Sequence, residues 1–480
     1  MTDYDDILKD IIDGANPVGD SAKSKDKAKR GQSLPLDYLS WGDPGNPDGQ
    51  ENRLHTPPVM DEKGFHGPLR EVVDIATENS EASPVAIAAN YLAMFAACVG
   101  RGPYQEIGDG ICHARPFMLL VGKSAKARKG TSEDTPRKIL ECSDGLLAKE
   151  NQGHRRLKVH TGGLSSGEGI GYALRDPVED KNGVVTDEGV TDKRLLIIEP
   201  EFANAMAAAS REKSTLSGTI RNLWDGRTIE PLVKNSRWKA TRPHGVIMGH
   251  ITVHELLKKT SDVDAYSGFL NRFVMLYVAR AKLVSDPLPT TDEKIIHLAR
   301  RFGSIVQTAT ENFKAENQRK IVFSADGKGF WNEIYPELTR DIDGITGALM
   351  ARAEIYCRMY AKMFALLDKA QQIEICHIEA SMAWNKYWLE SVEYIYGDES
   401  ALQELEDIDK LADEVLAFVK EHKGCSRTDL TTRFKHEYAS ERVDLGLERL
   451  FGIAPPRLKQ TVEPRADGRN GKGKTRFWAI

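Results

Sequence analysis

The stretch FMLLVGKSAKARKGTS, residues 117–132, decides the fold that the sequence predicts. Its first six residues form a run that is apolar on both faces, which is typical of a strand buried within a sheet. A turn rich in glycine and lysine follows, and Thr131 and Ser132 open a predicted helix. In that context backbone N–H groups, a helix N-terminus and a lysine can together hold a phosphate.

Four more apolar runs continue this alternation of strand, turn and helix, at residues 157–163, 195–200, 245–252 and 273–280. Because the runs are apolar on both faces and separated by helices, they predict an α/β core with a mostly parallel sheet that is covered on two sides. The predicted segments are a flexible tail (1–60), an N-terminal helical segment (61–115), a P-loop ATPase core (116–290), a helical lid (291–400) and a C-terminal domain (401–480).

Length and composition limit the possible classes of protein. A chain of 480 residues exceeds the roughly 250–300 residues of a single core, so we expect two or more folded units. A hydrophobic content of 40% and a charged content of 29% exclude a mostly disordered, fibrous or polytopic membrane protein. The formal net charge of -5 implies that any nucleic-acid site is a local patch.

The cysteines and the N-terminus indicate a cytoplasmic protein. The six cysteines are scattered without a CxxC pair or other metal-ligand spacing, which predicts free buried thiols in a reducing compartment. The acidic start lacks the features of a secretory signal. The longest apolar run, Pro84 to Gly100, is shorter than the roughly 20 residues that cross a bilayer, so we expect a buried helix there and no membrane partner.

Helical patterns flank the predicted sheet. The spacing of apolar residues from His66 to Gly100 predicts two packed helices, and Arg101 to Gly110 is expected to turn the chain. After about residue 290 the strand signals end. The clearest helices there are predicted from Ile345 to Leu367 and from His377 to Tyr396.

The turn after the first strand departs from the GxxxxGK[ST] pattern of a P-loop, because Lys129 precedes Gly130 instead of following a glycine. A solvated basic turn is therefore the alternative interpretation of this motif alone. The residues expected to contact the nucleotide are Gly122, Lys126, Lys129, Gly130, Thr131, Ser132 and, from the lid, Arg352.

Two carboxylates follow the strand at 195–198. A P-loop enzyme needs one carboxylate for the Mg²⁺ shell and another to polarise the attacking water. We expect Glu199, with Thr131, to serve the metal and Glu201 to activate water, so ATP and Mg²⁺ are the expected cofactors. Pro200 between them leaves this division of roles open, and an acidic strand-to-helix turn is the alternative.

The segment GFLNRFVMLYV places Arg272 at the mouth of a strand, and the predicted helix at 345–367 carries Arg352 and Arg358. These resemble the arginine-finger segment and the lid helix of AAA+ ATPases, particularly minichromosome-maintenance and superfamily 3 helicases. The strand at 245–252 lies where such proteins carry the polar sensor of the terminal phosphate. His250, as a catalytic candidate, and Thr252 are therefore expected there. A surface salt bridge is the alternative for each arginine.

A run of motifs resembles the YfjI-like family of P-loop proteins of plasmids, prophages and other bacterial mobile elements. The motifs are VGKSAKARKGTS, GLSSGEGIGYAL, LLIIEPEFANAM, STLSGTIRNLWDG and VIMGHITVHELL, and the resemblance covers roughly residues 65–480. It implies a replication-associated, helicase-like ATPase. Since no primase-polymerase domain is recognised, priming would need another chain.

The serine-rich segment GLSSGEG has a simpler interpretation as well. Ser165 with Glu168 fits a capping box that starts a helix, and a role at the subunit junction is the alternative.

The stretch from Arg227 to Arg242 predicts a basic hairpin before the strand at 245–252. Helicases of the resembled classes direct such a hairpin into the pore of a ring. Lys234, Arg237 and Lys239 would then attract single-stranded DNA, and Trp238 would stack on a base. A solvated hairpin on the rim is the alternative.

The last 80 residues predict a winged helix. A helix from Leu402 to Glu421 precedes two helices capped by Ser426 and Ser440, and LKQTV and TRFWAI form a ribbon around a basic loop. The residues expected to contact duplex DNA are Arg469, Lys472 and Lys474.

These predictions describe an ATP-dependent DNA helicase or translocase that forms a homo-oligomeric ring, expected to be a hexamer. ATP would lie between subunits, with Gly122, Lys129 and Thr131 on one side and Arg272 supplied by the neighbour. One alternative is a nucleotide-gated, DNA-binding initiator or regulator with little or no hydrolysis. Another is a RecA-like sheet, which would alter the strand order and move the finger.

Overall fold

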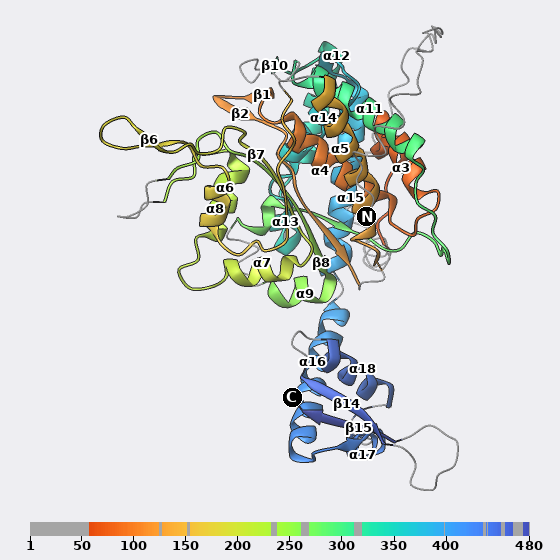
Figure 1. The fold of residues 1–480 in the computed structure, drawn as a ribbon. Coiled ribbons are helices and arrows are strands. Elements are labelled where there is room, and N and C mark those ends of the chain that lie inside the picture. The colour runs from red at the N-terminus through yellow and green to blue at the C-terminus, as the bar shows by residue number, and fades with distance from the viewer. Residues whose placement is uncertain are drawn as a thin grey trace. The chain divides into compact units, whose positions relative to one another are not determined.

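The computed structural model describes residues 57–123, 127–150, 154–231, 238–260, 268–311, 319–397, 399–434, 438, 440–452, 457–463 and 474–479. The chain divides into two compact units, with the first ending at Gly397 and the second beginning at Asp398. The predicted sheet and the helices on either side of it in the sequence all belong to the first unit (Figure 1).

Five parallel strands form the central sheet, in the order β4-β7-β8-β3-β9. They are β4 (Val159–Thr161), β7 (Arg194–Glu199), β8 (His244–Thr252), β3 (Phe117–Gly122) and β9 (Val274–Tyr277). Each corresponds to one of the five predicted runs, so the predicted α/β core with a parallel sheet is confirmed.

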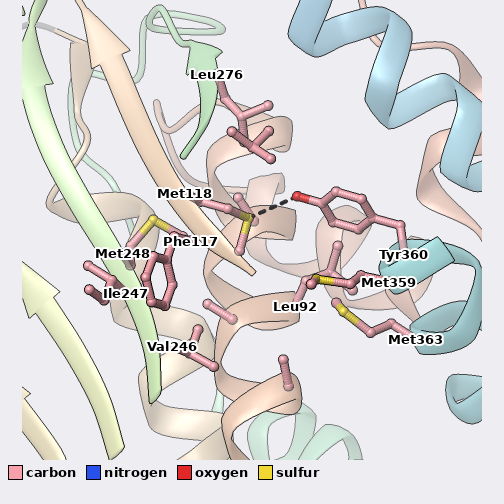
Figure 2. Packing of buried hydrophobic residues seen from close by; sticks show 14 of the residues in the cluster. Leu92, Phe117, Met118, Val246, Ile247, Met248, Leu276, Met359, Tyr360 and Met363 are labelled. Atoms are coloured by element: carbon pink, nitrogen blue, oxygen red, sulfur yellow. Dashed lines mark hydrogen bonds between the residues drawn. The ribbon is translucent and has the colours of Figure 1, made fainter. Parts of the chain in front are cut away.

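Helices cover both faces of this sheet, as the apolar runs predicted. On one face Met118 of β3 lies against α14 (Ala353–Leu367), where the Tyr360 hydroxyl donates to the Met118 sulfur at 3.2 Å, and Leu92 of α4 (Pro84–Val99) lies nearby (Figure 2). On the other face Gly249 of β8 leaves room for Phe202 of α7 (Phe202–Ala209), because a Cβ at residue 249 would lie 2.6 Å from its ring.

Further helices complete the first unit. The two helices predicted between His66 and Gly100 are present as α3 and α4, and α15 matches the helix predicted from His377. The bounds are η2 (Glu62–Phe65), α3 (Pro68–Thr77), α5 (Thr131–Glu150), α6 (Gly167–Ala173), α8 (Leu216–Asp225), α9 (Val253–Lys259), η4 (Leu270–Arg272), α11 (Asp292–Ala309), α12 (Ala325–Leu338), α13 (Gly344–Met350) and α15 (Ile375–Tyr396).

Short strands lie outside the central sheet. The segment from Arg101 to Gly110, predicted as a turn, instead contributes a strand that pairs with two others, in the order β10-β1-β2. The bounds are β1 (Pro103–Ile107), β2 (Gly110–Cys112), β5 (Val178–Glu179), β6 (Val185–Asp187), β10 (Arg319–Lys320), β11 (Val322–Phe323) and β12 (Gln372–Ile373). The prediction that the first unit has no strands after about residue 290 is therefore wrong, because β10, β11 and β12 lie beyond it.

Two predicted helix boundaries are wrong. The helix expected from Ile345 to Leu367 is divided between α13 and α14, because Arg352 leaves the helical conformation, with φ -119° and ψ 17°. The N-cap of α6 is Ser166 instead of Ser165, and its side chain accepts the N–H of Gly169. The Glu168 side chain accepts instead from the Thr215 hydroxyl at 2.9 Å, so no capping box forms.

The second unit has its own hydrophobic core, which includes Val415, Leu430, Leu450 and Phe477. Its elements are α16 (Glu399–Glu421), β13 (Cys425–Ser426), α17 (Arg427–Phe434), α18 (Ser440–Gly452), β14 (Leu458–Glu463) and β15 (Lys474–Ala479). The predicted three helices and two-stranded ribbon are present, and β13 adds a third strand in the order β13-β15-β14.

Two findings bear on the predictions from composition. No helix among the described residues is long and apolar enough to cross a membrane. All six cysteines are free thiols, as predicted, but Cys376 on α15 is exposed whereas the other five are buried.

Candidate functional site

The candidate site lies at the carboxyl edge of the central sheet. All strand pairs are parallel, and Gly122 at the end of β3 is opposite Thr252 at the end of β8. The connection that leaves β3 leads to β4 at one edge, whereas the connection that leaves β8 leads to β9 at the other. Ligands of open α/β sheets bind outside the carboxyl ends of strands where connections diverge in this way.

Gly122 allows the turn after β3 to fold back on the strand. A Cβ at this position would lie 2.6 Å from Ala127 and 2.9 Å from the Val278 carbonyl oxygen, so a larger residue would disturb the turn. The Lys129 amine lies 3.4 Å from the same position. The structure therefore brings Lys129 to the end of β3. Lys126 lies outside the described residues.

The surroundings of Lys129 combine burial with one acidic group. Burial lowers the pKa of Lys129, while Glu255 on α9 acts in the opposite direction. Glu255 is held by a capping box with Thr252, whose hydroxyl donates to the Glu255 carboxylate at 2.7 Å. Thr252 thus starts α9, and its hydroxyl is engaged in the cap.

His250 is a buried polar residue at this edge. It is 4% exposed, and its Nε2 atom has no hydrogen-bond partner among the described residues. Burial, together with the charge of Lys129, lowers the pKa of His250 to about 4, so the imidazole is neutral at physiological pH. A buried polar atom without a partner is uncommon in native proteins and is a feature of ligand sites.

Glu199 and Glu201 occupy different environments. Glu199 is 4% exposed, and its carboxylate accepts the Leu164 N–H at 2.8 Å and the Glu201 N–H at 3.3 Å. Glu201 is exposed at the start of α7 and accepts a hydrogen bond from the Asn204 amide at 2.8 Å. Glu199 therefore fixes the backbone around Glu201, whereas the carboxylate of Glu201 reaches the surface.

Three neighbouring residues that were predicted to bind nucleotide differ in exposure. Gly130 and Thr131 are exposed at the start of α5. Ser132 is fully buried; its hydroxyl donates to the Lys129 carbonyl oxygen and accepts from the Asn90 amide at 3.0 Å. Because Ser132 points into the protein, its predicted contact with nucleotide has no geometric support.

The predicted finger and lid arginines meet inside the first unit. Arg272 is 7% exposed, and its guanidinium pairs with Asp225 at 3.1 Å. The Arg352 guanidinium lies 4.7 Å from the Trp224 ring centre, and its Nε donates to the Asn271 side chain at 3.1 Å. In this arrangement Arg272 presents no exposed guanidinium to a neighbouring subunit. Arg358 pairs with Glu354 within α14.

The base of the predicted hairpin is present as an antiparallel bridge between Ile229 and Ala240. Lys239 is exposed, but the Trp238 ring packs against α6, where a Cβ at Gly171 would lie 2.0 Å from it. Trp238 is therefore engaged in packing rather than presented for stacking on a base. Of the other predicted DNA contacts, Lys234, Arg237, Arg469 and Lys472 lie outside the described residues, and Lys474 begins β15.

A second group of potential ligands combines His66, Cys376 and His377, whose ligand atoms lie within 4.8 Å of one another. The Nδ1 atom of His377 accepts the Glu374 N–H at 2.9 Å, so the ring proton lies on Nε2 and faces Asp368. This imidazole then has no free lone pair for a metal. We therefore assign the group to a hydrogen-bond network around Asp368.

Sequence reasoning missed several partners in the first unit. Asp225, Asn90 and Asp368 contact residues far away in the sequence, and no local pattern identifies them. Glu255 could have been found, because Thr252 and Glu255 have the spacing of a capping box.

No protein-family model matches the chain, and no curated protein matches it.

Proposed function

We propose that the chain is an ATP-hydrolysing P-loop protein with an AAA+-like core that moves on or remodels DNA during replication of a mobile element. The observation that carries the proposal is the convergence at one sheet edge. There Lys129 lies beside Gly122, the unpartnered buried His250 lies on the adjacent strand, and the acidic pair Glu199 and Glu201 follows β7. A lysine that binds the phosphates and carboxylates that hold Mg²⁺ or position the nucleophile recur in phosphoryl-transfer sites.

Each residue would have a distinct role. Lys129 would bind the phosphates together with the backbone N–H groups that open α5. His250, neutral because of its lowered pKa, would donate a hydrogen bond to the terminal phosphate without adding charge. Glu201, exposed and oriented through Glu199 and Asn204, would position the attacking water.

The donors at this edge fit Mg²⁺. Thr131 and Glu199 offer oxygen atoms, which are the ligands that Mg²⁺ prefers, and Thr131 is exposed at the first turn of α5. Glu199 is buried, so it would contribute through the water that Mg²⁺ retains in proteins. When bound with ATP, Mg²⁺ would neutralise the charge that develops on the phosphates.

The second unit supports the DNA part of the proposal. Three helices followed by the antiparallel pair β14 and β15 support the proposal that this unit is a winged helix. Lys459 is exposed on β14. Together with the basic residues between the two strands, it would attract duplex phosphates.

A second candidate function is a nucleotide-gated initiator or regulator that hydrolyses little ATP. It is favoured by one observation, the burial of Arg272 against Asp225, since a finger in trans needs an exposed guanidinium. In this case the protein would bind ATP, and turnover would remain near background with DNA present.

The test is steady-state ATP turnover by the full chain, with and without single-stranded DNA, beside direct ATP binding. We expect Lys129→Ala to weaken ATP binding, and Glu201→Gln to retain ATP but stop turnover. Lys149→Ala at the other end of α5 and Glu212→Gln are the matched controls, because both side chains are exposed away from the turn. Normal turnover in both site variants would remove the assignment.

A further inference from the structure

A pocket lies at the amino-terminal edge of the central sheet, opposite the candidate site. Its volume is about 500 Å³, and it is bordered by the starts of β7 and β8 and by the segment after α4. This volume lies within the range of small-molecule sites. The carboxyl edge, with Lys129 and Glu201, contributes no residue to its lining.

Basic residues dominate the lining of this amino-edge pocket. They are Arg101, Arg155, Lys193, Arg194 and Arg242. His244 also lines the pocket, but burial holds its pKa well below the usual range, so it adds no charge. Among the lining residues in the described part of the chain, Asp192 is the single carboxylate. The pocket therefore has an excess of positive charge, which contrasts with the net charge of -5 of the whole chain.

Two of these cations are already neutralised. The Arg194 guanidinium pairs with Asp192 at 2.7 Å, and the Lys193 amine pairs with Asp176 at 2.7 Å. The Arg101 guanidinium donates to two neutral groups, the carbonyl oxygens of Gly226 and Pro243. Arg155 and Arg242 are exposed at the rim of the pocket. Three guanidinium groups thus remain without a carboxylate partner among the described residues.

Buried atoms behind the rim are also unsatisfied. Nε of Arg101 and Nδ1 of His244 are buried without a hydrogen-bond partner, and His244 is 1% exposed. Arg115, 3% exposed, adds a further buried guanidinium close to Arg101 near Gly226. Nε2 of His244 donates to the Ala96 carbonyl oxygen, so its Nδ1 is an unfilled acceptor, whereas Nε of Arg101 is an unfilled donor. Because burying polar atoms without partners destabilises a protein, their concentration around one pocket indicates a ligand.

The backbone at Arg242 is held in an unfavourable conformation. Its φ angle is 50°, in the left-handed region that non-glycine residues rarely adopt. The preceding residue, Thr241, is fixed by hydrogen bonds from its N–H and hydroxyl to Asp176. The conformation that carries the Arg242 side chain to the rim is therefore imposed by its neighbours, which is a feature of functional sites.

We propose that this pocket binds a phosphorylated small molecule of about mononucleotide size. Guanidinium groups pair with phosphate oxygens, and three uncompensated guanidiniums suit a ligand with more than one negative charge. Apolar lining from Cys98 and Val99 offers a surface for the organic part of the ligand. A volume of about 500 Å³ matches a small organic phosphate.

The test is equilibrium binding of adenosine monophosphate and of inorganic pyrophosphate to the full chain carrying Lys129→Ala, which removes the cation of the carboxyl-edge site. We expect binding of at least one probe, weakened about tenfold or more by Arg155→Gln combined with Arg242→Gln. Arg156→Gln is the matched control, because Arg156 is the exposed neighbour of Arg155 and does not line the pocket. Arg155→Gln alone, at an exposed position, serves as a variant whose folding is not at risk.

Three outcomes would overturn the proposal. In the first, neither probe binds. In the second, Arg156→Gln weakens binding as much as the pocket variants do, which would indicate diffuse surface charge. In the third, the pocket variants reduce binding of a short single-stranded oligonucleotide but of neither small probe, which would identify a nucleic-acid contact instead. Each readout is binding rather than hydrolysis, so it is independent of the proposed ATPase activity.

Discussion

The Arg272 guanidinium and the Asp225 carboxylate form an ion pair in the interior of the first unit, with 3.1 Å between Nη2 and Oδ1. Arg272 ends η4, just before β9, and Asp225 ends α8, so the pair joins two residues that are 47 positions apart in the sequence. The Tyr356 hydroxyl, which also accepts from the Trp224 indole at 2.9 Å, donates to the Arg272 carbonyl oxygen. Arg272 is thus part of the packing between the sheet and the helices around it.

This ion pair predicts a loss of stability in Arg272→Ala. Arg272 is buried but Asp225 is 21% exposed, so removing the guanidinium leaves a carboxylate that water reaches only in part, and we expect the free energy of unfolding to fall by about 1–3 kcal/mol. Urea denaturation measures it. The matched control is Arg227→Ala, because Arg227 lies 3.7 Å from the same carboxylate but is 74% exposed, and it should cost less than about 0.5 kcal/mol. Equal effects would contradict a structural role for Arg272.

Thr131 and Ser132 are adjacent but should respond in opposite ways. Ser132→Ala removes a buried hydroxyl that accepts from Asn90, so we expect a loss of about 1–3 kcal/mol in unfolding free energy with little change in nucleotide affinity. Thr131→Ala, at an exposed position, should preserve stability and weaken the Mg²⁺-dependent part of ATP binding. Thermal unfolding and ATP titrations with and without Mg²⁺ measure both. The reverse pattern would contradict the assignment.

Gly171 is expected to tolerate no side chain. Since a Cβ at this residue would lie 2.0 Å from the Trp238 ring, Gly171→Ala should displace the ring and lower the unfolding free energy by about 1–3 kcal/mol. Gly218→Ala is the control, because nothing lies within 4 Å of the corresponding position in α8. There the substitution should be neutral or stabilising by up to about 1 kcal/mol. Similar results for the two variants would show that Trp238 does not pack on α6.

The hydrogen-bond network around Asp368 predicts a pH-dependent contribution to stability. Burial raises the pKa of Asp368, but hydrogen bonds from His377 and His66 outweigh it, so the pKa lies below its usual range. The contribution is therefore complete above the unfolded value of about 4 and is lost as the pH falls through the folded value.

We accordingly expect Asp368→Asn to cost about 1–2 kcal/mol at neutral pH. The difference in unfolding free energy between Asp368→Asn and the wild type should become smaller below about pH 4. Urea denaturation across the acidic range measures it, and Asp74→Asn, at an exposed position, should show a small offset that does not vary with pH. A constant cost for Asp368→Asn at every pH would contradict the network.

The second unit should carry affinity for duplex DNA without carrying hydrolysis. Deleting the chain from Asp398 onward removes a unit with its own core, so the first unit should remain folded. We expect weaker duplex binding and a shallower salt dependence, by about one slope unit for each lost phosphate contact. Basal ATP turnover should persist, since the proposed nucleotide ligands precede that residue. An unchanged salt slope would favour a protein-docking role for this unit.

The central sheet could be predicted from the sequence because strands buried on both faces are read as continuous apolar runs. FMLLVG has the same bounds as β3, and the other four runs each overlap one strand. The two-residue strands β10, β11 and β12 could not be predicted, because each exists only through a distant partner, as in the pairing of Pro103 with Arg319. Their sequences contain too few residues to show a period.

The candidate site was predictable only in part. The positions of Gly122, Glu199 and His250 near the carboxyl ends of predicted strands placed them at one edge of the sheet, because parallel strands end at the same edge. Whether a side chain faces that edge depends on contacts from elsewhere. Asn90 on α4 turns Ser132 inward, and Asp225 on α8 retains Arg272. Neither contact can be recognised from the sequence around Ser132 or Arg272.

The unequal exposure of the six thiols offers a chemical handle. Because Cys376 alone among them is exposed, a maleimide dye should attach at a single position on α15 without prior removal of cysteines. Burial raises the pKa of Cys376, so labelling should proceed slowly at neutral pH and faster in mildly alkaline buffer. A second dye on a cysteine introduced in the second unit would then report, by energy transfer, whether nucleotide changes the distance between the two units.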